Sequence, residues 1–154
     1  MSGNVMVVGV GGVGHVIVST LLSDPLVDQI IAVDISENNL KHLEEKYGRE
    51  KISTHKVDAR DSDQLGKLMK NVNILVNAAH YSLNLDLIEN CLKYGCNFIS
   101  LTGGEELWIE GGSRFKEMIE LHLQRDSEWR RNELTGILGL GEDPVSQISL
   151  QDTW

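Results

Sequence analysis

The sequence predicts an α/β fold, a doubly wound parallel sheet of six strands in a single domain. Short apolar runs alternate with helical patterns along the 154 residues, in the order βαβαβαβαβαβ. The apolar runs have no polar face, which is typical of parallel strands that helices cover on both sides. Parallel strands need long crossover connections, and the helical patterns supply them. We therefore expect right-handed crossovers and the strand order 3-2-1-4-5-6.

The six predicted strands share a high content of Val, Ile and other apolar residues, as strands commonly do. They cover residues 5–8, 29–33, 52–57, 73–77, 97–101 and 135–140. The third run gives the weakest of the six signals. A chain of 154 residues, 41% of them hydrophobic, suits one domain with one sizeable core.

Five helices are predicted from apolar residues spaced three and four apart and from end signals. They cover residues 12–22, 36–47, 61–69, 83–94 and 113–131. Ser36 and Asp61 are placed to cap two N-termini, and Gly48 and Gly95 to end two helices. The last helix is highly charged, and its apolar side is expected in the core: Phe115, Met118, Ile119 and Leu123. Residues 105–113 form the loosest segment and are expected to be mobile.

The chain is acidic, with 14 Lys and Arg residues against 23 Asp and Glu residues and a net charge of −9. This charge disfavours nucleic acid and anionic membranes as partners. No apolar run is long enough for a membrane helix, and the N-terminal segment lacks the features of a signal peptide. Cys91 and Cys96 lack the spacing of a redox or disulfide motif, so we expect two reduced thiols and a cytoplasmic protein.

Glycines crowd the end of the first apolar run, where Gly9, Gly11, Gly12 and Gly14 contain the pattern GxGxxG. A packed core does not require glycine there, because it costs about 0.5–1 kcal/mol inside regular structure. In a dinucleotide-binding loop, Gly9 permits a tight turn, Gly11 lets a pyrophosphate approach, and Gly14 lets helix and strand pack closely. The helix N-terminus, including Val13, would present N–H groups to the phosphates. The alternative is a glycine-rich turn that binds nothing.

An acidic residue, Asp34, ends the second predicted strand 20 residues after Gly14. At this spacing its carboxylate would accept hydrogen bonds from the ribose hydroxyls of an adenine dinucleotide. The same charge would repel a 2′-phosphate, and the next residues, Ile35 and Ser36, supply no arginine to bind one. These residues favour NAD over NADP as the cofactor.

The ends of the third and fourth strands supply further candidates, because open α/β sheets bind ligands at the carboxyl edge. Asp58, beside Ala59, would hydrogen-bond the adenine amino group, or serve only as a loop or capping acid. Ala78 and Ala79 are small residues where a cofactor would cross the sheet edge, although strand-end packing also explains them. His80 would contact the ribose or nicotinamide, or lie on the polar surface.

The sequence shows no catalytic or metal-binding group of residues. Neither GxSxG nor GxxxxGK[ST] occurs, which argues against a serine hydrolase and a P-loop NTPase. The remaining histidines lack partners at metal-ligand spacing: His15, His42, His55 and His122. Hydride transfer is the chemistry of the cofactor itself, so this chain alone is expected to bind dinucleotide and to catalyse little.

Six stretches of the chain resemble the N-terminal nucleotide-binding Rossmann domain of the saccharopine dehydrogenase-like oxidoreductases. In chain order they read VMVVGVGGVG, AVD, KVDARD, NILVNAA, LKYGCNFIS and GILGLGEDP. The last stretch, residues 136–144, is the most specific, because in the family it leads out of the Rossmann domain and into the substrate domain. The resemblance implies an enzyme that forms or oxidises secondary amines, or deaminates amino acids, by hydride transfer with NAD(P).

The resemblance also implies a domain division and a set of site residues. Residues 1–140 would form the cofactor domain, and residues 141–154 would begin the linker to a substrate domain that is missing from the sequence. The carried-over residues are Gly9, Gly11, Gly12 and Gly14 for phosphate, Asp34 for ribose, Asp58 for adenine, and Ala78 and Ala79 for the inner edge of the cofactor. Three positions depart from the family pattern: Ile35 replaces a basic residue, Ser100 an acidic one, and Val145 a glycine.

Two other classes of protein share parts of the pattern. A regulatory nucleotide-sensing Rossmann domain of the potassium-transport type has a similar length, glycine loop and acids, but residues 136–144 favour the oxidoreductase. A short-chain dehydrogenase is disfavoured because Leu85, rather than lysine, lies four residues after Tyr81. A missing substrate domain would leave apolar surface near the C-terminus, which favours a homodimer or a separate substrate domain as the partner.

Overall fold

A parallel sheet with the strand order β3-β2-β1-β4-β5-β6 forms the centre of the computed structural model, which describes residues 2–101 and 123–140. Every strand pairs with its neighbours in parallel. The fold and the strand order predicted from the sequence are therefore confirmed. The chain runs outward from β1 to β3 and then returns to the other side of β1 through β4, which creates a topological switch point between β1 and β4.

The strands lie close to their predicted positions, and the largest difference is at the end of the chain. They are β1 Gly3–Val8, β2 Val27–Asp34, β3 Ile52–Lys56, β4 Ile74–Asn77, β5 Asn97–Ser100 and β6 Gly136–Ile137. The sequence predicted six residues for the last strand, whereas β6 has two. Gly136 and Ile137 lie in register with Phe98 and Ile99 of β5. The Thr135 carbonyl also accepts from the Phe98 N–H (2.9 Å), and the Leu140 N–H donates to the Ser100 carbonyl (3.1 Å), but neither residue is part of the strand.

The helices also follow the predictions, with short 3-10 turns added at two places. They are α1 Gly12–Leu22, α2 Glu37–Tyr47, α3 Ser62–Leu68, η1 Met69–Asn71, η2 Tyr81–Leu83, α4 Asn84–Tyr94 and α7 Asp126–Arg131. The two predicted N-caps are confirmed, since Ser36 accepts from the Asn39 N–H (3.3 Å) and Asp61 accepts from the Gln64 N–H (3.0 Å). Gly95 follows α4 with a φ of 75°, a left-handed conformation that favours glycine.

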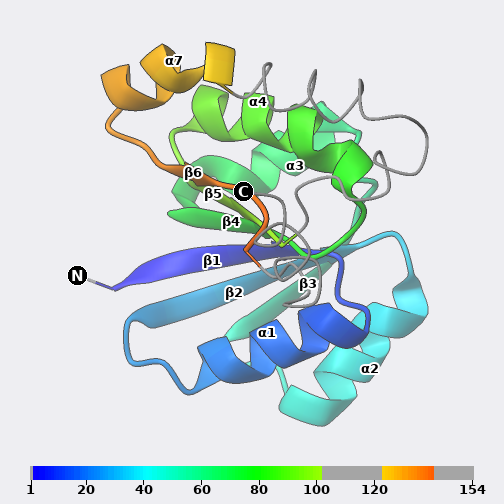
Figure 1. Ribbon diagram of the computed structural model, residues 1–154. Helices are drawn as coiled ribbons and strands as arrows, with labels where there is room; N and C mark the ends of the chain where they lie inside the picture. The colour runs from blue at the N-terminus through cyan, green and yellow to red at the C-terminus, as the bar shows by residue number, and fades with distance from the viewer. Residues whose placement is uncertain (1, 102–122, 141–154) are drawn as a thin grey trace, which may run out of the picture.

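Helices cover both faces of the sheet, with α1 and α2 on one face and α3, α4 and α7 on the other (Figure 1). Successive residues of β1 point to opposite faces, so Val5 and Val7 join the core under α1 and α2. Met6 and Val8 join the core under α3, α4 and α7. Because both faces of β1 are buried, the strand has no polar side, and this burial explains the continuous apolar run in the sequence.

Part of the predicted last helix, residues 113–131, lies outside the described residues, as do Phe115, Met118, Ile119, the loose segment 105–113 and the expected linker 141–154. Leu123 is described, and its predicted core position is wrong because 67% of its surface is exposed. Cys91 and Cys96 are buried free thiols in contact with each other. That contact and burial raise the pKa of Cys91, which favours the thiol over the thiolate.

Candidate functional site

A cleft of about 370 Å³ lies at the carboxyl ends of β1, β2, β3 and β4. Most of the residues predicted for the site line it: Gly9, Gly11, Asp34, Ile35, Asp58, Ala59, Ala78, Ala79 and His80. Gly12, Val13 and Gly14 are not part of the lining, and they begin α1 directly behind it. The switch point of the sheet, the site that open α/β folds use for ligands, therefore coincides with the predicted residues.

Two glycines of the loop are required by the packing of the protein itself. Gly9 has a φ of 84°, and a Cβ there would lie 2.7 Å from the Cβ of Ala79. A Cβ on Gly14 would lie 2.0 Å from the carbonyl oxygen of Gly9. Any larger residue at either position would push α1 away from the end of β1 or distort the loop.

The middle of the loop is different, because packing among the described residues does not require glycine there. A Cβ on Gly11 or Gly12 would meet no atom of residues 2–101 and 123–140 within 4 Å, apart from its chain neighbours and its own helix. Gly11 has a φ of −70°, which other residues adopt readily, and it lines the cleft. As the N-cap of α1 it has no side chain to satisfy the first N–H groups of the helix, whereas Ser36 and Asp61 cap α2 and α3. The loop therefore leaves open space and uncapped N–H groups on the cleft side.

Asp34 joins the glycine loop to the end of β2. Its Oδ2 accepts hydrogen bonds from the Val10 N–H (2.8 Å) and from Nδ2 of Asn39 (3.2 Å). Its Oδ1 accepts from the Ser36 N–H (2.7 Å). Hydrogen bonds to a charged acceptor are strong, so these three donors hold the carboxylate in one orientation at the cleft wall. Sequence reasoning missed Asn39, although its place in the first helical turn after Asp34 was a usable signal.

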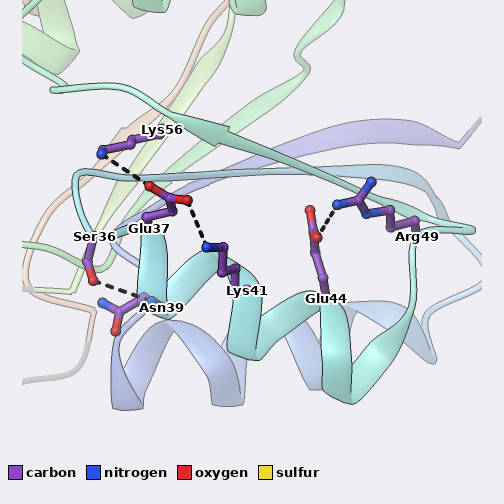
Figure 2. A network of polar contacts seen from close by, with 7 residues as sticks. All are labelled: Ser36, Glu37, Asn39, Lys41, Glu44, Arg49 and Lys56. Carbon is purple, nitrogen blue, oxygen red and sulfur yellow. Dashed lines mark hydrogen bonds and ion pairs between the residues drawn. The ribbon is translucent and has the colours of Figure 1, made fainter.

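Ion pairs along α2 connect this helix to β3 and to the loop between them (Figure 2). Glu37 pairs with Lys41 at 2.9 Å and with Lys56, at the end of β3, at 3.5 Å. The hydrogen bond from Lys41 is the main cause of a lowered pKa of Glu37. Glu44 pairs with Arg49 beyond the end of the helix. Exposed pairs contribute little to stability, so we expect these pairs to add little to the fold.

A tight turn after β3 places Asp58 and Arg60 in the cleft. Oδ1 of Asp58 accepts from the Arg60 N–H (3.0 Å), and the Asp58 carbonyl accepts from the Asp61 N–H (2.9 Å). Oδ2 of Asp58 makes no hydrogen bond with the residues that the structure describes. Arg60 lines the same cleft, and sequence reasoning missed it although it follows Asp58 in the stretch KVDARD.

Buried amides hold the turn that carries Ala78, Ala79 and His80. Asn77 is completely buried, donates from Nδ2 to Oδ1 of Asn84 (2.7 Å) and accepts the Ala79 N–H on Oδ1 (3.0 Å). His80 caps η2, with its Nδ1 3.0 Å from the Ser82 hydroxyl, and its ring lies 4.1 Å from that of Tyr81. Packing at the strand end explains the small side chain of Ala79 in part, because Ala79 lies against Gly9. The turn that contains Ala79 also lines the cleft.

The acidic side chains and the histidine of this cleft are held by contacts within the protein. Its two carboxylates accept hydrogen bonds from the surrounding protein, and the ring of His80 contacts Ser82 and Tyr81. In the described part of the chain, no three His, Cys, Asp or Glu side chains are grouped so that they could hold a metal ion. Within residues 2–101 and 123–140, no helix has the length and apolar character needed to span a membrane.

A doubly wound sheet, an uncapped glycine loop and acids after the next two strands define a dinucleotide-binding domain of the Rossmann type. The chain belongs to the family described as the saccharopine dehydrogenase NADP binding domain, whose family model matches residues 5–121. This membership confirms the resemblance seen in the sequence and favours an oxidoreductase cofactor domain over a nucleotide sensor. Comparison with curated protein sequences gave no match.

Solved structures share this fold. Apo saccharopine dehydrogenase (L-Glu forming) from Saccharomyces cerevisiae aligns with 98% of this chain and 31% of its own, with a TM-score of 0.68 and 14% identity. GenD2 from gentamicin A biosynthesis, in complex with NAD, aligns with 90% of this chain and 34% of its own (0.62, 18%). Pen from Bacillus thuringiensis aligns with 67% of this chain and 38% of its own, with a TM-score of 0.61 and 17% identity. The chain spans about a third of the length of these proteins.

Proposed function

We propose that this chain binds NAD(H) in the cleft and serves as the cofactor domain of an oxidoreductase. The observation that carries the proposal is Gly11. Packing explains Gly9 and Gly14, whereas Gly11 borders open space at a backbone conformation that any residue can adopt. Approach of a pyrophosphate to the loop is a direct reason for glycine at that position.

Each part of the cleft then has a role in binding. The uncapped N–H groups of α1, behind Gly12 and Val13, bind the pyrophosphate with the help of the helix dipole. Asp34 binds the adenosine ribose, and Asp58 accepts a hydrogen bond from the adenine amino group. The turn at Ala78 and Ala79, with His80, borders the nicotinamide half of the cofactor.

The preference for NAD over NADP rests on Asp34. Three donors hold its carboxylate at the end of β2, so a 2′-phosphate would meet a fixed negative charge. The family is described as NADP binding, and one similar structure contains NAD, so both cofactors belong in the test. Phosphate binding would require a compensating cation, and Ile35 stands where a basic residue would be most effective.

The reaction that we propose is hydride transfer to or from an amino acid or a secondary amine. Residues 1–140 form the cofactor domain, and residues 141–154 lead towards a substrate domain, a separate chain or a second copy that supplies the substrate contacts. The buried reduced cysteines suit the cytoplasm. The cofactor supplies the hydride chemistry, and this domain positions the dinucleotide.

Calorimetric titration of the 154-residue chain with NADH and NADPH tests the proposal. We expect NADH to bind at least about tenfold more tightly than NADPH, a difference of about 1.4 kcal/mol. Asp34→Asn removes the charge and keeps an acceptor for the Val10 N–H, while its amide nitrogen replaces the acceptor of the Ser36 N–H. It should narrow the difference between the NADH and NADPH affinities. Asp34→Ala should weaken NADH binding as well. Binding of neither dinucleotide would overturn the proposal, and tighter binding of NADPH would overturn the cofactor preference.

A further inference from the structure

Arg60 stands out in the cleft because its side chain has no polar partner among the described residues. It lines the cleft and is exposed, and it makes no side-chain hydrogen bond or ion pair with any described residue. Among the described residues lining the cleft, it is the one with a permanent positive charge. Lys56, four residues earlier, instead pairs with Glu37 outside the cleft.

The position of Arg60 is set by the turn that begins at Asp58. The Asp58 carboxylate accepts from the Arg60 N–H at 3.0 Å, and the Arg60 carbonyl accepts from the Ser62 N–H at 3.1 Å. The same turn leaves Oδ2 of Asp58 available to a ligand. One short segment therefore contributes both Asp58 and Arg60, a carboxylate and a guanidinium side chain, to the lining of the cleft.

An exposed apolar residue lies on the neighbouring strand end. Ile35 is 68% exposed and lines the cleft, so the protein core does not account for it. It follows Asp34, which is paired in register with Lys56 of β3. The ends of two adjacent strands thus carry an apolar side chain, a carboxylate oxygen and a guanidinium group.

We propose that Arg60 stacks its guanidinium plane on the adenine ring and that Ile35 covers the opposite face of the base. This inference rests on the proposed function and deepens it, because it assigns the faces of the base as well as its edge. A guanidinium group is planar and weakly hydrated, and it stacks on aromatic rings better than an ammonium group does. Arg60 is thereby a binding residue for the purine and not for a phosphate.

The test uses ADP-ribose, which lacks nicotinamide, beside NADH and NADPH in calorimetric titrations of the full chain. Arg60→Ala should weaken all three by the same factor, roughly three- to thirty-fold for a cation–π contact of moderate strength. Arg60→Lys should recover little of the loss, and Arg60→Tyr much of it. The loss of affinity caused by Arg60→Ala should remain the same at about 0.5 M NaCl. Interactions between exposed charges are already screened beyond about 10 Å at roughly 0.1 M salt, so a purely electrostatic effect would shrink.

Lys56→Ala is the matched control, since it removes the same charge from the end of β3 without touching the cleft. It should change the affinities less than about twofold, as expected for an exposed charge. Equal effects of Lys56→Ala and Arg60→Ala, unchanged binding by Arg60→Ala, or a loss confined to NADPH would each overturn the stacking role. A wild-type chain that binds none of the three ligands would instead overturn the proposed function.

Discussion

The two ends of the cleft are built in different ways. At the glycine loop, the wall is backbone, shaped by Gly9 and Gly14 packing against Ala79 and against each other. At the far end, the wall is made of side chains from two strand ends, chiefly Asp34 and Asp58. The shape of the first end requires glycines, which have no side chain. The second end is formed by carboxylates that backbone N–H groups of nearby residues orient.

This difference teaches where folding and binding share residues and where they are separate. At the backbone end, one loop contains two glycines that the packing requires, Gly9 and Gly14, and one, Gly11, for which we propose that the ligand is the reason. At the side-chain end, binding groups are also hydrogen-bonded to the protein, so a substitution there changes both the ligand contact and its support. The following substitutions separate these contributions, in order of decreasing effect.

Gly14→Ala should produce the largest change, and the change should be in stability. The new Cβ would lie 2.0 Å from the Gly9 carbonyl oxygen, a backbone atom that cannot move aside cheaply. We expect a loss of about 3 kcal/mol or more in the free energy of unfolding. Urea unfolding followed by circular dichroism measures it, and a stability equal to that of the wild type would contradict the packing argument.

Gly11→Ala is the partner experiment within the same loop. A Cβ there meets no atom of another described residue within 4 Å, so the free energy of unfolding should change by less than about 1 kcal/mol. NADH affinity should fall by more than about tenfold, because the methyl group occupies the space of the pyrophosphate. Unchanged NADH binding in this variant would remove the observation on which the proposed function rests.

Replacing the adenine amino group probes the side-chain end. Nicotinamide hypoxanthine dinucleotide carries a carbonyl there, which would face Oδ2 of Asp58 without a hydrogen bond. We expect its reduced form to bind the wild type about tenfold more weakly than NADH. Asp58→Asn keeps an acceptor for the Arg60 N–H and turns a donor towards the base, so it should narrow or reverse the preference. If the ratio of the two dinucleotide affinities were the same in the wild type and in Asp58→Asn, Asp58 would have no role in recognising the base.

A substitution in the contact between α1 and α2 should have the smallest effect on stability. α1 follows the glycine loop, and α2 follows the end of β2. The His15 ring lies 5.2 Å from that of His42, and its buried Nδ1 has no hydrogen-bond partner among the residues that the structure describes. Tyr47 and Lys46 complete the surroundings on α2. Burial, followed by the charges of His42 and Lys46, lowers the pKa of His15 below its ordinary 6.5.

The unfolded chain therefore binds this proton more readily than the folded chain does. The contribution of His15 to stability is complete above about pH 6.5 and is lost as the pH falls towards the lowered pKa. His15→Gln should flatten the pH dependence of the urea midpoint between about pH 7 and 5. His55→Gln on β3 serves as the control, and a wild-type slope in His15→Gln would refute the assignment.

Much of the fold was predictable because its signals are local. The buried strands show as apolar runs without a polar face, and the caps at Ser36 and Asp61 act within a few residues of each other. The last strand was overestimated, since among the described residues only Gly136 and Ile137 are in strand register with β5, while Thr135 and Leu140 bond to β5 from outside the strand. A strand ends where its pairing with the adjacent strand ends. The length of an apolar run in the sequence does not show how far that pairing extends.

The sequence by itself determined the doubly wound fold, the strand order and the glycine loop, because alternation of elements and close glycine spacing are properties of consecutive residues. The tertiary structure alone decided that Asn39 holds Asp34, that Asn77 and Asn84 form a buried amide pair, and that Arg60 enters the cleft. These contacts join different elements, and the direction of each side chain depends on how the turns leave the sheet. The tertiary structure also distinguished the role of Gly11 from that of Gly14. Only three-dimensional packing shows at which of the two glycines an added Cβ would clash with another atom.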